Sequence, residues 1–319
     1  MDPLDGAGLN GWTPVHVRTG TGTPALDWAI VERPYLDPFF EQTAYAAMQR
    51  PFNQVFARST SLEALDTLRA SVAPAGLVFH MSRCGSTLIA QMLSRLTSAS
   101  VLSEPQPVDA LLRLRGRVPG LTDEILAARL RALVGALAGP NAGRSRVFVK
   151  FHAWHVLELP FIARAFPGVP WAFVFREPRA VLASQNRAPG AEVLAGTIDP
   201  AYLGLSAQAA YAVAPDEYAA RAVAAFCDAA LSNAAPGGGA FFDYAGLPGG
   251  VFAELLPFFG VTATEGEKSA MHAAAQLDAK DQESTFRAPA ARANTTALID
   301  DLAARFLDAR YAALRARSR

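Results

Sequence analysis

Short apolar runs alternate along the chain with amphipathic segments, and this alternation predicts the fold class. The apolar runs span residues 77–80, 101–103, 146–151, 171–175 and 239–244. Between them, apolar side chains recur at the spacing of a helix with one buried face. These helices are predicted at 86–96, 121–139, 159–166, 178–185 and, as a pair, 200–234. Buried strands that alternate with helices are typical of a mostly parallel sheet with helices on both faces, so we predict an α/β protein.

The two ends of the chain flank this α/β pattern. We predict helices over residues 37–50 and 60–74, and a loop over the Gly- and Thr-rich residues 16–24. After the last strand, further helices are predicted at 251–260 and 296–319. The chain therefore divides into a helical N-terminal extension, residues 1–75, and an α/β domain, residues 76–319.

Polar side chains follow each of the predicted strands. They are Ser82, Arg83, Ser86, Thr87, Glu104, Lys150, His152, His155, Arg176, Asp243 and Tyr244. The ligand crevice of a parallel sheet lies beyond the carboxyl ends of its strands. We therefore expect these side chains to gather at one edge of the sheet.

The loop after the first strand has the features of an anion site. Gly85 lets the backbone approach a ligand closely, and the free amides at the start of the next helix attract phosphate. Ser86 and Thr87 add hydroxyl donors, and Arg83 adds a charged donor fork. Taken alone, the same loop is also compatible with an ordinary strand-to-helix turn whose Ser and Thr cap the helix.

A second segment repeats this design. Arg176 directly follows the fully apolar strand at 171–175, Pro178 opens a helix, and Ser184 lies within that helix. Two anion sites on one edge of a sheet indicate a ligand with two separated phosphate groups.

Several other chemistries do not fit the loop. An ATP-binding Walker A loop needs glycine five residues before Gly85 and lysine directly after it, where the chain has His80 and Ser86. A hydrolase elbow needs glycines where Cys84 and Leu88 stand. Cys84 also lacks the arginine of a cysteine phosphatase, and we expect its thiol to be packed. His152 and His155 lack a third ligand, so no metal site is predicted.

The composition narrows the partners and the compartment. The 29 basic and 29 acidic residues balance, whereas nucleic-acid binding usually needs a basic excess. No apolar stretch approaches the ~18–20 residues that span a bilayer, and residues 1–11 lack a secretion signal pattern. The two cysteines, Cys84 and Cys227, fit a reducing compartment. We expect a soluble cytoplasmic protein without nucleic-acid or membrane partners. The sequence does not determine its oligomeric state.

Three segments, in this order, resemble the motifs of sulfotransferases that use 3′-phosphoadenosine 5′-phosphosulfate (PAPS). The 5′-phosphosulfate loop of the family resembles residues 80–93, HMSRCGSTLIAQML. Its 3′-phosphate segment resembles residues 173–185, FVFREPRAVLASQ. Residues 241–261 are similar to the strand, Tyr-x-x-Leu and helix that follow in the family. Order and spacing agree from about residue 76 to 262.

This resemblance implies a P-loop NTPase-like sulfotransferase fold, PAPS as the donor and adenosine 3′,5′-bisphosphate (PAP) as the product. Residues 83–87 would hold the 5′ end of the donor, and Arg176 with Ser184 would hold its 3′-phosphate. The donor-binding residues that it implies are Arg83, Cys84, Gly85, Ser86, Thr87, Arg176, Ser184 and Tyr244.

Two features depart from the family pattern. The usual Tyr-Glu-Asp-Leu is Tyr-Ala-Gly-Leu at residues 244–247 and lacks both acidic residues. A late Arg-Lys-Gly segment that helps to hold the 3′-phosphate is not evident. Lys280 and Arg287 are the candidates to replace it.

Sulfuryl transfer parallels phosphoryl transfer, in which positioned cations stabilise a loose in-line transition state. Arg83 and Lys150 are the predicted cations, and no metal is required. Two kinds of base are candidates for the acceptor proton. Glu104 is preferred because it lies beside the loop, on condition that burial raises its pKa. His152 and His155 are the alternatives, since they resemble the histidine base of cytosolic members.

We therefore predict a PAPS-dependent sulfotransferase that modifies a hydroxyl or amine of an unidentified small-molecule, carbohydrate or peptide acceptor. Residues 1–75 are expected to form a lid or the acceptor side of the site. Two functions of other classes remain as alternatives. One is a small-molecule kinase on the same sheet, which would need Mg²⁺ and lacks its loop lysine. The other is a non-catalytic nucleotide-binding protein.

Overall fold

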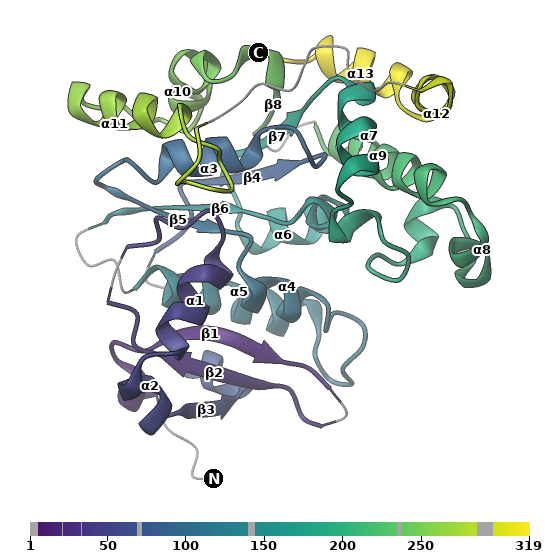
Figure 1. The fold of residues 1–319 in the computed structure, drawn as a ribbon. Helices are drawn as coiled ribbons and strands as arrows, with labels where there is room; N and C mark the ends of the chain where they lie inside the picture. The colour runs from purple at the N-terminus through teal and green to yellow at the C-terminus, as the bar shows by residue number, and fades with distance from the viewer. Residues whose placement is uncertain are drawn as a thin grey trace.

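A computed structural model describes residues 6–20, 22–32, 34–68, 72–139, 144–234, 238–285 and 296–319. At its centre lies a five-stranded sheet with the order β5-β6-β4-β7-β8, in which every pairing is parallel (Figure 1). The strands are β4 (Gly76–His80), β5 (Ala99–Ser103), β6 (Arg146–Lys150), β7 (Trp171–Phe175) and β8 (Gly239–Asp243). They coincide with the five apolar runs of the sequence, so the predicted α/β class is confirmed.

Helices cover both faces of this sheet, as strands buried on both sides require. Figure 1 places α3 on one face and α5 and α6 on the other. The helices of this part are α3 (Ser86–Leu93), α4 (Gln106–Leu112), α5 (Asp123–Ala138), α6 (Leu159–Ala165), α7 (Pro178–Arg187), α8 (Ala207–Ala212), α9 (Pro215–Ser232), α10 (Leu256–Phe258) and α11 (Glu265–Ala275). The sequence predicted most of them to within a few residues but missed α4 and α11. The helix predicted at 251–260 is a π-helical turn, Val251–Leu255, that continues into α10.

The strand order explains why polar residues of distant segments converge. From the central strand β4 the chain crosses to the edge strand β5 and returns through β6, and β7 then pairs with the other side of β4. The direction of winding therefore reverses at β4. In such sheets the ligand crevice lies beyond the carboxyl ends of the strands at this reversal.

The N-terminal extension contains a second sheet that the sequence did not predict. Its antiparallel strands have the order β1 (Thr13–Arg18), β2 (Ala25–Ala29) and β3 (Arg58–Ser61). The predicted loop is therefore shorter than residues 16–24, because β1 extends to Arg18. Helix α1 (Phe40–Met48) confirms the helix predicted at 37–50, and a short α2 (Pro51–Val55) follows it.

The α-helix predicted over residues 60–74 is wrong. Strand β3 ends at Ser61, and a 3₁₀ helix then spans Leu62–Thr67. Buried Leu62 and Leu65 lie three positions apart, a spacing that fits the three residues per turn of a 3₁₀ helix as well as an α-helix. The extension is thus mixed in structure.

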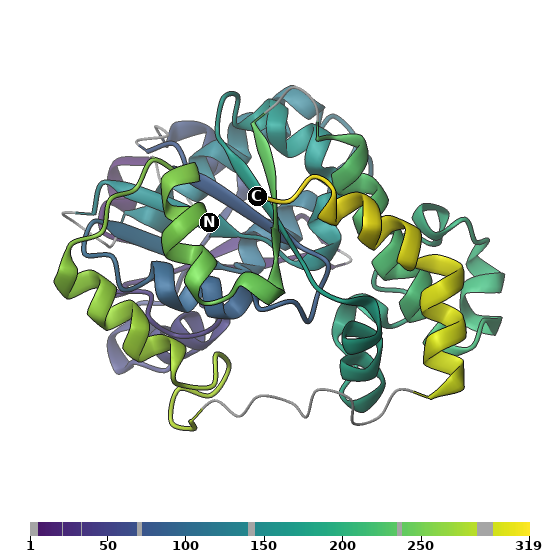
Figure 2. The ribbon, with the colours of Figure 1, turned by 90° about the horizontal axis from the view of Figure 1, so that it is seen from above.

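The predicted long terminal helix is divided in two. Helices α12 (Ala297–Phe306) and α13 (Asp308–Arg315) meet at Leu307, whose side chain is buried. Figure 2 shows both helices (yellow) beside α9, which they contact. The break at Leu307 therefore lets two successive segments bend around the same neighbour. In the described part of the chain, no helix is long and apolar enough to cross a membrane.

Candidate active site

A cavity of about 560 Å³ opens at the carboxyl ends of β4, β5, β6 and β7, within the usual range for small-molecule sites. The residues predicted for donor binding, and Glu104, Lys150 and His152 among the predicted catalytic residues, line it. They are Arg83, Cys84, Gly85, Ser86, Thr87, Glu104, Lys150, His152, Arg176, Ser184 and Tyr244. The structure therefore brings together residues that lie up to 161 positions apart in the sequence (83 to 244). Their individual roles stay predictions.

The loop after β4 turns sharply at Gly85, which caps α3. Its φ of +81° lies in the left-handed region, which favours glycine. A Cβ at this position would also lie 2.8 Å from the side chains of Tyr244 and Leu247. The first amides of α3, at Ser86 and Thr87, have no partners within the helix. They lie at the cavity, at the position where the sequence predicts an anion site.

The backbone around the cavity is strained. Among the described residues, the non-glycine residues with positive φ are Ser82 (73°), Arg83 (50°) and Glu104 (52°). All three line the cavity. Such conformations cost on the order of 1–3 kcal/mol each and cluster at functional sites. At Glu104 the conformation is held by its N–H, which donates to the Lys150 carbonyl at 2.7 Å.

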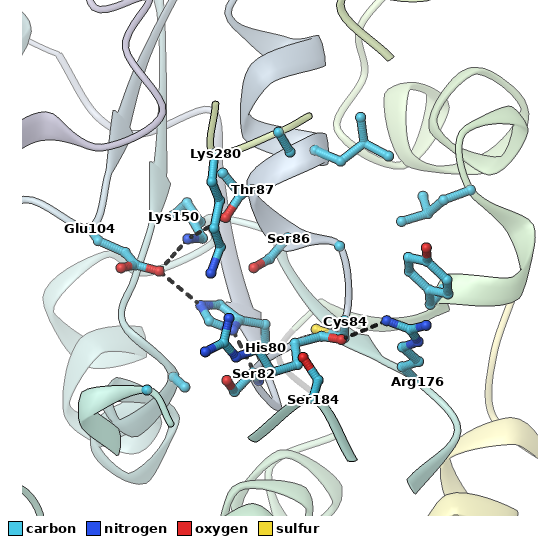
Figure 3. Close-up of a pocket in the computed structure, with 18 of the residues that line it drawn as sticks. His80, Ser82, Cys84, Ser86, Thr87, Glu104, Lys150, Arg176, Ser184 and Lys280 are labelled. Atoms are coloured by element: carbon cyan, nitrogen blue, oxygen red, sulfur yellow. Dashed lines mark hydrogen bonds and ion pairs between the residues drawn. The ribbon is translucent and has the colours of Figure 1, made fainter. Parts of the chain in front are cut away.

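The Glu104 carboxylate is the centre of a charged network (Figure 3). It forms an ion pair with the Lys150 ammonium and lies 3.2 Å from His152 Nδ1 and 3.5 Å from His80 Nε2. The Lys150 side chain is almost fully buried and also lies 3.4 Å from the Thr87 hydroxyl. The network therefore joins the ends of β4, β5 and β6 to the first turn of α3.

This network sets the charge of Glu104. Burial is the largest single influence and acts to raise the pKa of the carboxyl, but the Lys150 ammonium and the hydrogen bonds from His152 and His80 outweigh it. The pKa of Glu104 is thereby held well below its usual range. The condition set for Glu104 as the base, a pKa raised by burial, is therefore not met. A carboxylate of low pKa, with both oxygens engaged, is a weak general base.

His80, at the end of β4, is a site residue that the sequence analysis missed. Its Nδ1 accepts the Ser82 N–H at 3.1 Å, so the ring proton is on Nε2, which faces the Phe151 carbonyl at 3.0 Å and the Glu104 carboxylate. Burial lowers the pKa of His80 and favours this neutral form. A lone histidine at the end of an apolar strand, directly before the loop, was the signal that could have identified it.

A second carboxylate, Glu192, was also missed. It reaches the cavity from the segment after α7, where it accepts hydrogen bonds from the Ser82 hydroxyl and, at 2.9 Å, from the Gln185 amide. Burial acts to raise its pKa, but these hydrogen bonds outweigh burial and lower it. Nothing in the local sequence distinguishes Glu192 from other surface glutamates.

The two candidate histidine bases lie in different places. His152 lines the main cavity, and its ring stacks on Trp154 with centroids 4.3 Å apart. His155 lines a neighbouring cavity of about 400 Å³, and its Nε2 lies 2.9 Å from Asp109. Asp109 also accepts from Trp154 Nε1 at 2.8 Å. The structure therefore keeps His152 as a candidate base and places His155 behind it, in a supporting position.

The other end of the cavity is formed by Arg176, Ser184 and Tyr244. The Arg176 guanidinium lies 4.1 Å from the centre of the Tyr244 ring and donates to the Arg83 carbonyl at 3.3 Å. Within the described part of the chain, no carboxylate forms an ion pair with Arg176. Ser184 lines the cavity from α7. The Arg83 side chain donates to the Ala188 carbonyl and so ties the loop to the end of this helix.

Cys84 contributes to the cavity through its backbone. Its side chain is fully buried, and its thiol donates to the Val174 carbonyl at 3.1 Å. Burial raises the pKa of this thiol to about 12, so the reactive thiolate is not formed near neutral pH. The predicted packing role of the side chain is confirmed.

Two further segments reach the cavity. Phe39, in the N-terminal extension, lines it, and the Lys150 ammonium lies 5.3 Å from the centre of its ring. Lys280 lines it from the segment after α11. Arg287, the other candidate for a C-terminal cation, lies outside the described residues. In the described ranges, no group of three or more His, Cys, Asp or Glu side chains is arranged to hold a metal ion.

Comparisons with known proteins give structural neighbours at low identity. No family model and no curated protein matches the chain. The sulfotransferase domain from the curacin biosynthetic pathway covers 73% of this chain and 97% of its own, with 14% identity and a TM-score of 0.42. Sulfotransferase STF9 from Mycobacterium avium covers 83% and 82%, with 14% identity and a TM-score of 0.45. The sulfotransferase domain from the Synechococcus PCC 7002 olefin synthase covers 66% and 80%, with 18% identity and a TM-score of 0.41.

Proposed function

We propose that the protein is a PAPS-dependent sulfotransferase. The observation that supports this proposal is that one cavity has hydrogen-bond donors suited to an anion at each end, with His152 beside the first of them. The amides and hydroxyls of Ser86 and Thr87, with Arg83, suit the 5′-phosphosulfate of the donor. Arg176 and Ser184 suit its 3′-phosphate. A kinase would instead need a lysine directly after Gly85, where the chain has Ser86.

The chain's own side chains can supply the chemistry around the transferred group. When bound, the donor supplies a sulfuryl group, whose bond to the 5′-phosphate oxygen breaks as its bond to the acceptor oxygen forms. Arg83 and Lys150 stabilise the negative charge that this transfer spreads over the oxygens. Because the ammonium of Lys150 is already oriented by Glu104 and Thr87, little reorganisation is needed.

His152 is the general base in this proposal. Glu104 accepts from its Nδ1 and the Trp154 ring stacks on it, so that the imidazole has a defined orientation. The other nitrogen, Nε2, then accepts the proton of the acceptor hydroxyl. Glu104 becomes the carboxylate that orients the base, which fits its lowered pKa better than the role first predicted for it.

Ligand-induced thermal stabilisation tests the proposed function. PAP, ADP and ATP are compared with and without Mg²⁺, since only a ligand that binds the folded state raises the midpoint of unfolding. Stabilisation by PAP without Mg²⁺ is expected. If ATP with Mg²⁺ stabilised the protein and PAP did not, the result would favour the kinase alternative.

Transfer itself needs a separate experiment. Isotopically labelled PAPS is incubated with a panel of hydroxyl- and amine-containing metabolites, carbohydrates and peptides, and labelled products are identified by mass spectrometry. A labelled sulfate ester or sulfamate is expected. PAP binding without any labelled product would favour the non-catalytic alternative.

A further inference from the structure

The chain has three lysines, and two of them lie at the main cavity. They are Lys150, Lys268 and Lys280, among 29 basic residues of which the rest are arginine. Two of the three, Lys150 and Lys280, line the main cavity. A lysine offers a compact charge with three donors, unlike the planar fork of arginine. Lys150 is paired with Glu104, whereas the role of Lys280 is not explained by any contact described so far.

Lys280 is held on a short turn that follows α11. The Asp278 carboxylate accepts the Lys280 N–H at 2.9 Å and so shapes the turn. The turn is also tied to the chain after α3, because Arg95 donates to the Gln282 side chain at 2.9 Å. Since α11 itself packs against α3, the turn follows a helix that contacts the one whose N-terminus lies at the cavity.

The Lys280 ammonium points into the cavity on the side of Glu104 and Lys150, with Arg176 beyond Ser86 (Figure 3). It lies 6.0 Å from the centre of the Phe39 ring. Among the described residues it forms no ion pair and no side-chain hydrogen bond. Its charge is therefore directed into open space within the cavity.

The surroundings of this ammonium call for an anion. Burial lowers the pKa of Lys280, and repulsion by Arg83 and Lys150 acts in the same direction. Glu104 and Glu192 attract it only partly, and both carboxylates are already engaged by other groups. A cation that is partly removed from water, beside two others, is stabilised by an anion between them. Lys280 and the four charged groups that act on it all line the cavity.

We propose that Lys280 binds the sulfuryl oxygens of the donor, together with Arg83 and Lys150, and does not complete the 3′-phosphate site. This inference rests on the proposed function. It gives the cavity three cations around the transferred group, each from a different segment of the chain. It also assigns the turn after α11, which carries Lys280, to the end of the cavity where the sulfuryl group is transferred.

Two nucleotides separate the possible contacts of Lys280. Adenosine 5′-phosphosulfate carries the sulfuryl group and lacks the 3′-phosphate, whereas PAP carries both phosphates and lacks the sulfuryl group. Isothermal titration calorimetry of each ligand is performed with wild-type protein, Lys280→Met and Arg176→Met. Lys268→Met, on the outer side of α11, is the matched control for loss of one lysine charge.

The expected result is a reciprocal pattern. Lys280→Met weakens binding of adenosine 5′-phosphosulfate about tenfold, as the loss of one charge-assisted hydrogen bond predicts, and changes PAP binding less than about twofold. Arg176→Met weakens PAP binding and leaves adenosine 5′-phosphosulfate binding within about twofold of wild type. Lys268→Met changes neither. Unchanged thermal unfolding of each variant without ligand confirms that its fold is intact.

Three results would overturn the inference. Weaker PAP binding alone in Lys280→Met would assign this lysine to the 3′-phosphate, and equal weakening of both ligands would assign it to the 5′-phosphate. Unchanged binding of both would show that Lys280 contacts no part of the donor. If wild-type protein binds neither nucleotide, the proposed function itself fails, which is seen before any variant is compared.

Discussion

The two ends of the cavity are constructed differently. At the loop end, a central group of side chains is already paired, since Glu104 contacts Lys150, His80 and His152. At the other end, the contacts of the Arg176 guanidinium with described residues are an aromatic ring and a backbone carbonyl. Within the described residues, Ser184 has no hydrogen-bond partner for its hydroxyl.

On the proposed function, this difference distinguishes the end of the cavity where transfer takes place from the end that only binds the donor. Groups that take part in a reaction gain from being held in position before the ligand arrives, and the loop end meets that requirement with a buried network on strained backbone. A phosphate site needs only hydrogen-bond donors that are free to donate to the phosphate oxygens. Substitutions at the two ends should therefore have different consequences for turnover, stability and binding.

Replacement of the proposed base tests the reacting end most directly. His152→Asn should lower turnover about 10³-fold, because a positioned base typically contributes 10²–10⁴-fold, and should leave PAP affinity unchanged. Turnover is measured as transfer from labelled PAPS, and affinity by calorimetry. His272→Asn, at an exposed position of α11, is the control. Normal turnover in His152→Asn would exclude this residue as the base.

Glu104→Gln should reduce stability as well as turnover. It leaves the buried Lys150 ammonium without its carboxylate, which costs about 3 kcal/mol in the free energy of unfolding at pH 7. Because folding lowers the pKa of Glu104, its contribution is complete above the ordinary carboxyl value of 4.5 and is lost as the pH falls through the folded value below it. The difference from wild type should therefore narrow below pH 4.5, as measured by urea unfolding.

A double variant provides the control for this stability prediction. Adding Lys150→Met to Glu104→Gln removes the unpaired charge and should recover part of the lost free energy of unfolding. Equal stability of wild type and Glu104→Gln at pH 7 would contradict the view that Glu104 stabilises the fold by pairing with the buried Lys150 ammonium.

Arg176→Met should show the opposite behaviour at the binding end. The free energy of unfolding should change by no more than about 1 kcal/mol, the value of the contact with Tyr244, while PAP binding weakens roughly 10- to 100-fold through loss of charge-assisted hydrogen bonds. Calorimetry and urea unfolding measure the two effects. Arg187→Met, at the exposed C-terminal end of α7, the helix that follows Arg176, should change neither. Unweakened PAP binding in Arg176→Met would remove the 3′-phosphate site from this end.

The parallel sheet and the position of the site could be predicted because fully buried strands leave continuous apolar runs. Polar residues directly after such runs, as at Arg83, Glu104 and Arg176, must lie at one edge of the sheet. The N-terminal sheet was less evident, since its strands are only partly buried, a Gly- and Thr-rich segment joins β1 to β2, and two helices separate β2 from β3. The terminal helix, in turn, had no glycine or proline at Leu307 to indicate its break.

The electrostatics of the site could not be predicted from the sequence. The pKa of Glu104 depends on Lys150, which lies 46 positions away in the sequence, and on His80 at the end of a different strand. These three residues meet only because β6 lies between β5 and β4. Since the sequence did not determine this order, the condition that burial raise the pKa of Glu104 was set without knowledge of the partners that outweigh burial.

A carboxylate outside the cavity tests the comparison between the two ends of the cavity, and its expected effect is the smallest of those predicted. Glu267, on α11, is buried and accepts the N–H of Thr264 at 2.8 Å and both the N–H and the hydroxyl of Thr97 at 2.7 Å. These hydrogen bonds, with the Thr264 N–H foremost, lower its pKa to about 2. Glu267 therefore resembles Glu104 in its charge state but contacts none of the cavity groups.

Glu267→Gln should lower the free energy of unfolding by about 1–2 kcal/mol, because it weakens hydrogen bonds to a charged acceptor, and should leave PAP affinity unchanged. The contribution of Glu267 is complete above the ordinary carboxyl value of 4.5 and is lost as the pH falls toward about 2. Urea unfolding between pH 2 and 7 checks this, with the exposed Glu265→Gln as control. A loss of PAP affinity in Glu267→Gln, with stability intact, would mean that α11 and its turn govern binding at a distance, and the division into two independent ends would fail.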